Sequence, residues 1–132
     1  MPETGSLLLD TTVVVAIFRR IPGIREQVTA SDELLLPLFA LGELEYGVHR
    51  SSQPQRQRDA VSAFCEGVLI LAPGDQTARE YGLLKAELAL AGTPIPENDI
   101  WIAALAREHG LTLATLDAHF QRITNLQLFD WI

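Results

Sequence analysis

The chain has 132 residues, the length of one domain, and its 48% hydrophobic content is enough to fill a core. Its formal net charge of −7 and pI near 4.8 argue against nonspecific nucleic-acid binding through charge alone, which needs clustered lysine and arginine. No apolar run approaches the ~20 residues of a membrane helix, and residues 1–5 lack the basic start of a secretory signal. The lone Cys65 has no disulfide partner, so we expect a buried, reduced thiol in a single cytoplasmic domain spanning residues 1–132.

Short apolar runs alternate with helical patterns along the whole chain. The first strand, residues 6–9, is three leucines entered from Gly-Ser, and it ends at Asp10. Further strands are predicted at residues 34–37, 68–71 and 111–115, with an edge strand at 126–129. Helices are predicted at residues 13–18, 24–30, 38–49, 55–66, 75–91 and 100–108, with a short turn or helix at 117–123. This alternation predicts an α/β fold, a three-layer α/β/α sandwich around a mainly parallel sheet of four to five strands.

Helix termini carry recognisable signals in the second half of the chain. Asp75 is predicted to cap the helix 75–91, and Asn98 or Asp99 to cap the helix 100–108. Gly110 is predicted to end that helix as a left-handed residue. Asp10, which precedes two threonines, is open to two interpretations: it caps the helix 13–18, or it faces the crevice beyond the strand ends where ligands of α/β sheets bind.

Four acids are expected at one edge of the sheet. Asp10 ends the first strand and Asp117 follows the fourth, and parallel strands end at the same edge. Asp99 stands at a helix start that reaches that edge, and Glu43 lies in the first turns of the helix leaving the second strand. Each acid alone is also explained as a cap, a turn former or a solvated helix residue. Their joint placement is what indicates a site.

Glu45 competes with Glu43 for a place in this site. Positions 43 and 45 point about 200° apart on a helix, so only one of them faces the crevice. Glu43 lies beside the apolar face and near Gly47, which would allow a close approach by a neighbouring element. We therefore expect Glu43 in the site and Glu45 in solvent.

Four carboxylates on one rim repel one another and raise their own pKa values unless cations lie between them. A set of oxygens with no histidine or cysteine favours Mg²⁺ or Mn²⁺ over zinc. Such ions activate water and stabilise a phosphodiester transition state. The residues therefore predict a metal site formed by Asp10, Glu43, Asp99 and Asp117.

Four segments resemble, in order, the motifs of PIN-domain proteins, and more narrowly those of VapC-type toxins of toxin–antitoxin modules. They are Leu-Leu-Asp-Thr-Thr at 8–12, Gly-Glu-Leu-Glu-Tyr-Gly at 42–47, Asn-Asp-Ile-Trp-Ile-Ala-Ala at 98–104 and Thr-Leu-Asp-Ala-His-Phe at 115–120. The closing Leu-Phe-Asp-Trp at 128–131 is similar to the usual ending of that family. The resemblance covers nearly the whole chain. It departs from the family at Thr12, where Asn or Ser is common, and at Leu116, where a polar or basic residue is common.

The resemblance implies a PIN-like domain with a Mg²⁺- or Mn²⁺-dependent endoribonuclease activity that cleaves cellular RNA. It places the catalytic and metal-binding quartet on Asp10, Glu43, Asp99 and Asp117, with polar support from the residues Thr11, Asn98 and Thr115. It further implies a homodimer and a cognate antitoxin that inhibits the enzyme, in a heterotetramer or larger complex.

Two other functions are weighed against this one. A non-catalytic PIN-fold dimer that only binds a partner would have no use for four clustered carboxylates, which destabilise a fold. An aspartyl-phosphate phosphatase or receiver would use Asp10 as the phosphoacceptor. A phosphatase would place a second acid where Thr12 stands, and a receiver would place a lysine after a late strand, whereas the only lysine, Lys85, lies in a predicted helix.

Overall fold

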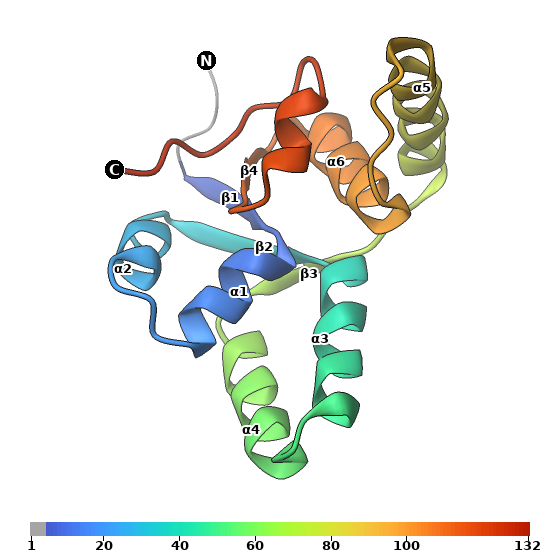
Figure 1. The fold of residues 1–132 in the computed structure, drawn as a ribbon. Helices are drawn as coiled ribbons and strands as arrows, with labels where there is room; N and C mark the ends of the chain where they lie inside the picture. The colour runs from blue at the N-terminus through green and yellow to red at the C-terminus, as the bar shows by residue number, and fades with distance from the viewer. Residues whose placement is uncertain (1–4) are drawn as a thin grey trace.

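A computed structural model describes residues 5–132 of the chain. Four of the five residues for which we predicted no secretory signal, residues 1–4, lie outside the described part. Four parallel strands form one sheet, with helices in every connection (Figure 1). The elements are, in chain order, β1 (Ser6–Leu9), α1 (Thr11–Phe18), α2 (Ile24–Thr29), β2 (Glu33–Pro37), α3 (Leu38–Arg50), α4 (Pro54–Cys65), β3 (Leu69–Leu71), α5 (Asp75–Ala91), α6 (Glu97–His109), β4 (Thr112–Ala114) and the 3₁₀ helix η1 (Ala118–Arg122).

The strand order is β3-β2-β1-β4, so β1 lies inside the sheet between β2 and β4. Leu8 pairs with Leu35 on one side and with Leu113 on the other, both in parallel register. The three leucines of β1 are at most 2% exposed, which means that helices cover both faces of the strand. The predicted three-layer α/β arrangement is confirmed.

The chain grows outward from β1 to β2 and β3, and then returns to place β4 on the opposite side of β1. The strand order thus reverses at β1, and in open α/β sheets ligands bind in the crevice beyond the carboxyl ends at such a point. Helices α3 and α4 form one packed pair, and α5 and α6 form another (Figure 1). None of the helices in the described part of the chain has the length and apolar content needed to cross a membrane.

Most predicted elements match the structure; one predicted strand is absent, and the other differences lie at helix ends. The predicted edge strand 126–129 is wrong: only an isolated bridge joins Leu128 to Leu113. Helix α6 begins at Glu97 after Pro96, so neither Asn98 nor Asp99 is its cap, and Gly74 rather than Asp75 caps α5. Gly110 does end α6 with φ 63°, as predicted.

Cys65 is half-buried at the end of α4 rather than fully buried. Burial is the main reason that the pKa of its thiol is raised, with a smaller effect from the negative charge of Glu45. A raised pKa keeps the thiol protonated and unreactive at neutral pH, which fits a packing residue.

Candidate active site

Asp10 lies at the centre of the carboxyl edge of the sheet. Its backbone N–H donates to the carbonyl of Ala114 at 2.9 Å, which extends the pairing of β1 with β4 by one residue. Its side chain is only 3% exposed, and its Oδ2 accepts hydrogen bonds from Thr12 Oγ1 at 2.7 Å and Thr115 Oγ1 at 2.8 Å. A buried carboxylate requires such partners. Asp10 occupies the N-cap position of α1, but its side chain makes no capping bond, so the structure excludes the interpretation of Asp10 as a cap.

Two threonine hydroxyls link the loop after β4 to the start of α1. Thr115 Oγ1 donates to Asp10 and accepts a 3.0 Å hydrogen bond from the backbone N–H of Asp117. Thr12 Oγ1 also donates to Asp10, and it accepts a 3.0 Å bond from the backbone N–H of Leu116. The hydroxyls therefore hold the Asp10 carboxylate and the backbone before Asp117 in one bonded network.

Glu43 reaches the same edge from α3. Its Oε1 accepts a 2.9 Å hydrogen bond from Thr11 Oγ1, and it is more exposed than the other three acids. Partial burial is the largest cause of its raised pKa; the Thr11 hydrogen bond lowers that pKa, and the charge of Asp10 raises it further. Glu43 is therefore within electrostatic range of Asp10, as the sequence predicted.

Glu45 points elsewhere and its side chain is 41% exposed, as expected, but it is also paired with a cation. It forms a two-bond ion pair with Arg58 of α4, in which Arg58 Nη1 lies 2.7 Å from Glu45 Oε2. This pair lowers the pKa of the Glu45 carboxyl. The predicted close approach at Gly47 is wrong, because no atom lies within 4 Å of the place where a Cβ at this position would stand.

Asp99 lies in the first turn of α6, and its side chain is 14% exposed. Burial, followed by the negative charges of Asp10 and Asp117, raises the pKa of Asp99 to about 6, although the nearby imidazole of His119 acts in the opposite direction. Glu43 contributes a smaller increase to the same pKa. The other three predicted acids therefore all interact electrostatically with Asp99.

His119 is part of this cluster, which the sequence analysis missed when it described a set of carboxylates alone. The side chain of Asp117 accepts a 2.9 Å hydrogen bond from the backbone N–H of His119, a local turn that begins η1. This turn brings His119 Nδ1 to 3.1 Å from Asp117 Oδ1 and 3.5 Å from Asp99 Oδ2. The sequence signal for such a turn is Asp117 itself, because aspartate side chains commonly accept a hydrogen bond from the backbone two residues further on.

All four predicted acids line one cavity, whose volume is about 540 Å³. Thr11, Thr12 and Asn98 also line it, so Asn98 is within reach of a bound ligand. Thr115 lies behind Asp10 and supports it without lining the cavity. We name this space the carboxylate cavity; its acids are Asp10, Glu43, Asp99 and Asp117.

The cavity suits a divalent cation. One ligand atom each from Asp99, Asp117 and His119 lie within 4.8 Å of one another. His119 Nδ1 is buried and has no hydrogen-bond partner within residues 5–132. Oxygen donors with one imidazole nitrogen are compatible with Mg²⁺ and better suited to Mn²⁺. Burial and then the negative charges of Asp10 and Asp117 raise the pKa of Asp99, and a bound cation would offset both effects.

The receiver alternative has no support in this geometry. Lys85, the lysine it would need near Asp10, donates at 3.0 Å to Glu97 and at 3.2 Å to the Tyr81 hydroxyl. At the position of the second acid of a phosphatase, Thr12 donates its hydroxyl to Asp10. Asp10 therefore has neither the lysine that a receiver needs nor the second acid that a phosphatase needs.

Comparison with known proteins agrees with the geometry. The PIN domain family matches residues 7–126. Ribonuclease VapC1 of Haemophilus influenzae strain R2866 is 32% identical over 129 residues, covering 94% of this chain and 96% of the relative. The tRNA(fMet)-specific endonuclease VapC of Salmonella typhimurium is 32% identical over 127 residues, with 94% and 96% coverage.

Solved structures agree as well. The VapBC-1 structure from nontypeable Haemophilus influenzae matches with a TM-score of 0.87 at 32% identity, covering 96% of this chain and 98% of that chain. VapBC2 from Rickettsia felis, bound to a DNA fragment from its promoter, matches with a TM-score of 0.88 at 28% identity, with 96% and 99% coverage. The protein therefore belongs to the PIN-domain family, and within it to the VapC-type proteins.

Proposed function

We propose that this protein is the toxin of a type II toxin–antitoxin module, a Mg²⁺- or Mn²⁺-dependent endoribonuclease that a cognate antitoxin inhibits. The carboxylate cavity carries the proposal, because its four acids and His119 converge where ligands bind to this type of sheet. The names of the relatives, ribonuclease and tRNA-specific endonuclease, support the reaction class. RNA as the substrate implies that the protein acts in the cytoplasm.

Some residues of the site would bind a cation, and others orient those residues through hydrogen bonds. We infer that Asp99, Asp117 and His119 would hold one ion, and that Asp10 and Glu43 face it from the other side of the cavity. Thr12 and Thr115 fix the Asp10 carboxylate, and Thr11 orients Glu43. A bound divalent cation in such a site makes water more acidic and stabilises the charge of a phosphodiester transition state.

The decisive experiment compares two acids that line the carboxylate cavity, Asp10 and Asp99, with an acid outside it, Glu45. Purified protein is incubated with cellular RNA in Mg²⁺, Mn²⁺ or EDTA, and the RNA ends are sequenced. We expect cleavage that EDTA abolishes, that Asp10→Asn and Asp99→Asn lose, and that Glu45→Gln keeps. Full activity of both Asp variants in excess Mg²⁺ would contradict the assignment of the site.

The assembly is also a proposal. We infer a homodimer that binds a smaller antitoxin, because the similar solved structures are VapBC complexes. An inhibitor that enters an acidic cavity should bring a basic or apolar segment. Light scattering at micromolar concentration should give the mass of a dimer, and expression with the neighbouring gene should give a larger complex. A monomer with no co-purifying partner would contradict this.

A further inference from the structure

Residues 126–132, which we call the closing segment, run beside β4. Leu113 of β4 donates its backbone N–H to the carbonyl of Gln127 at 2.8 Å, and its own carbonyl accepts the backbone N–H of Phe129 at 2.8 Å. These two bonds follow the pattern of a parallel ladder, in which alternate residues of one strand bond to the same neighbour. Thr115, directly after β4, is therefore the next residue whose carbonyl faces the closing segment.

The side chain of Trp131 supplies the next hydrogen bond along this line. In a continued ladder, the Thr115 carbonyl would accept the backbone N–H of residue 131. It accepts the indole Nε1–H of Trp131 instead, at 3.0 Å. A backbone bond is open to any residue except proline, whereas this bond requires a side chain that carries a donor at the position of the indole nitrogen. The residue type at position 131 therefore determines whether the Thr115 carbonyl is held.

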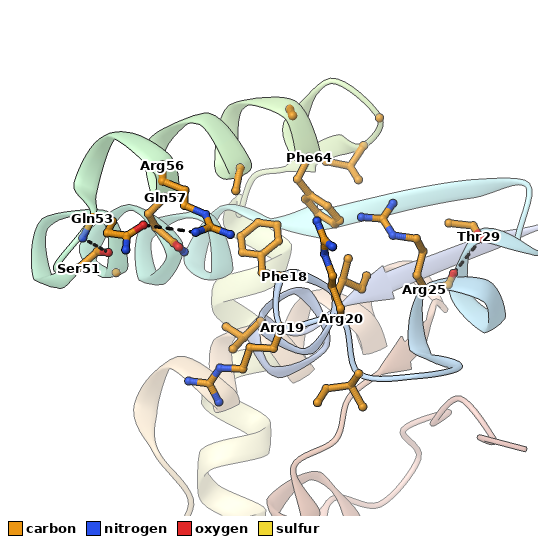
Figure 2. Close-up of a pocket in the computed structure, with 18 of the residues that line it drawn as sticks. Phe18, Arg19, Arg20, Arg25, Thr29, Ser51, Gln53, Arg56, Gln57 and Phe64 are labelled. Atoms are coloured by element: carbon orange, nitrogen blue, oxygen red, sulfur yellow. Dashed lines mark hydrogen bonds between the residues drawn. The ribbon is translucent and has the colours of Figure 1, made fainter.

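The indole of Trp131 is itself held in place. Its ring meets the ring of Phe129 edge to face, with centroids 4.7 Å apart, and both rings pack against the core. The backbone N–H of Ile132 donates at 2.8 Å to Oε1 of Gln27 on α2. Thr29 of the same helix lines a cavity of about 1550 Å³ (Figure 2), which Gln27 does not line. The closing segment is thus fixed on both sides of the indole.

The peptide group between Thr115 and Leu116 is hydrogen-bonded at both ends. The indole of Trp131 holds its carbonyl, and its N–H, that of Leu116, donates at 3.0 Å to Thr12 Oγ1. Because a peptide group is planar, bonds to its carbonyl and to its N–H together fix how the plane is rotated. Without the indole bond, the Thr12 hydroxyl alone would hold this plane.

This peptide group is linked to two acids of the carboxylate cavity. Thr115 Oγ1 donates to Asp10 at 2.8 Å and accepts the backbone N–H of Asp117 at 3.0 Å. The Asp117 side chain in turn accepts the backbone N–H of His119. A rotation of the peptide group would therefore displace the atoms that orient Asp10, Asp117 and His119.

We propose that Trp131 is a positioning residue of the active site, which acts through Thr115 on the carboxylates of Asp10 and Asp117. This rests on the proposed ribonuclease function. Trp131 does not line the carboxylate cavity, so its effect on an ion or on RNA bound there is indirect. Groups that orient metal ligands without touching the metal commonly change its affinity by about tenfold or more when they are replaced. A displacement of about 1 Å is also enough to slow catalysis strongly.

Three variants separate the indole hydrogen bond from the packing of the closing segment. Trp131→Phe keeps an aromatic ring and removes the indole N–H. Trp131→benzothienylalanine replaces that N–H by a sulfur atom and keeps the shape of the ring system, so it serves even if Trp131→Phe fails to fold. Phe129→Leu is the matched control, because it trims the ring that packs on Trp131 and leaves its own backbone bond to Leu113 intact. Melting curves record the loss of stability in each variant.

The first measurement is amide hydrogen exchange by NMR in EDTA, which needs neither metal nor RNA. We expect the amides of Leu116 and Asp117 to exchange about tenfold faster in both Trp131 variants, because their acceptors, Thr12 and Thr115, lose support. The amide of Asp10, which donates to Ala114, reports the change in overall stability. In Phe129→Leu, the exchange of Leu116 and Asp117 should change no more than that of Asp10.

The second measurement is function in the presence of a cation. We expect Mn²⁺ to bind both Trp131 variants about tenfold more weakly in calorimetric titrations. At saturating Mn²⁺, kcat for RNA cleavage should fall about tenfold while KM stays nearly unchanged, because Trp131 lies outside the cavity that holds the RNA. Phe129→Leu should keep the Mn²⁺ affinity and kcat of the natural protein, even where its Tm is lower.

Unchanged amide exchange and Mn²⁺ affinity in the benzothienylalanine variant would overturn the proposal. Equal effects of Trp131→Phe and Phe129→Leu on kcat and on Mn²⁺ would also overturn it, because the ring of Trp131 would then only pack the closing segment. If the natural protein binds Mn²⁺ and cleaves no RNA, the proposed ribonuclease function fails. The exchange rates and Mn²⁺ affinities would still support or overturn the positioning role in that case.

Discussion

Thr115 donates a 2.8 Å hydrogen bond to Asp10 across 105 positions of sequence, and so joins the loop after β4 to the end of β1. The same hydroxyl accepts the backbone N–H of Asp117. The Thr115 side chain therefore positions the carboxylate of Asp10 and also fixes the backbone at Asp117.

Replacing this hydroxyl by a methyl group should impair both acids. We expect Thr115→Val to lower RNA cleavage about tenfold and the free energy of unfolding by about 1 kcal/mol, since a buried acceptor loses a donor. Thr112→Val is the matched control on β4, because its hydroxyl makes only a 3.3 Å bond to Gln127. Cleavage rates and melting curves of the two variants decide this; equal losses would show that Thr115 has no special role.

The raised pKa of Asp99 predicts that the metal-free protein loses stability as pH rises. The folded state binds the proton up to pH about 6, whereas an unfolded aspartate releases it near pH 3.9, so stability falls with increasing pH between these values. Asp99→Asn should therefore stabilise the metal-free protein at pH 7, on the order of 2 kcal/mol, and should not do so near pH 3. Denaturant unfolding in EDTA at the two pH values measures this. A destabilised variant at pH 7 would contradict it.

Divalent cations should stabilise the natural protein. An ion that binds only the folded state adds about 2.7 kcal/mol at a hundred times its Kd, which corresponds to a rise of several degrees in Tm for this size of domain. The gain should disappear in Asp99→Asn and persist in Glu45→Gln. It should also shrink at pH 5, where Asp99 is protonated. Melting curves in EDTA, Mg²⁺ and Mn²⁺ test this, and equal shifts in both variants would place the ion elsewhere.

His119 should contribute to Mn²⁺ binding more than to Mg²⁺ binding, because imidazole nitrogen is a poor ligand for Mg²⁺. We expect His119→Ala to weaken Mn²⁺ about tenfold in calorimetric titrations and to change Mg²⁺ affinity less. His109→Ala, at the exposed end of α6, is the control and should change neither. An unchanged Mn²⁺ affinity in His119→Ala would show that the ring only packs against the acids.

The sequence by itself was sufficient to predict the parallel α/β fold. It was also sufficient to predict that four acids lie together, namely Asp10, Glu43, Asp99 and Asp117. The reason is that hydrophobic periodicity is local, and parallel strands necessarily end at one edge. Once the leucine run of β1 and its following acid are recognised, the edge at which Asp117 lies is settled as well.

Only the tertiary structure decided which side chains meet across long stretches of sequence. Arg58 forms an ion pair with Glu45 because α3 and α4 pack as a pair. The turn at η1 places the imidazole of His119 beside Asp99. Five arginines that line one cavity, Arg19, Arg20, Arg25, Arg50 and Arg56, are spread over 38 positions of the sequence. Their proximity depends on how four helices pack against one another, and this packing leaves no local pattern in the chain.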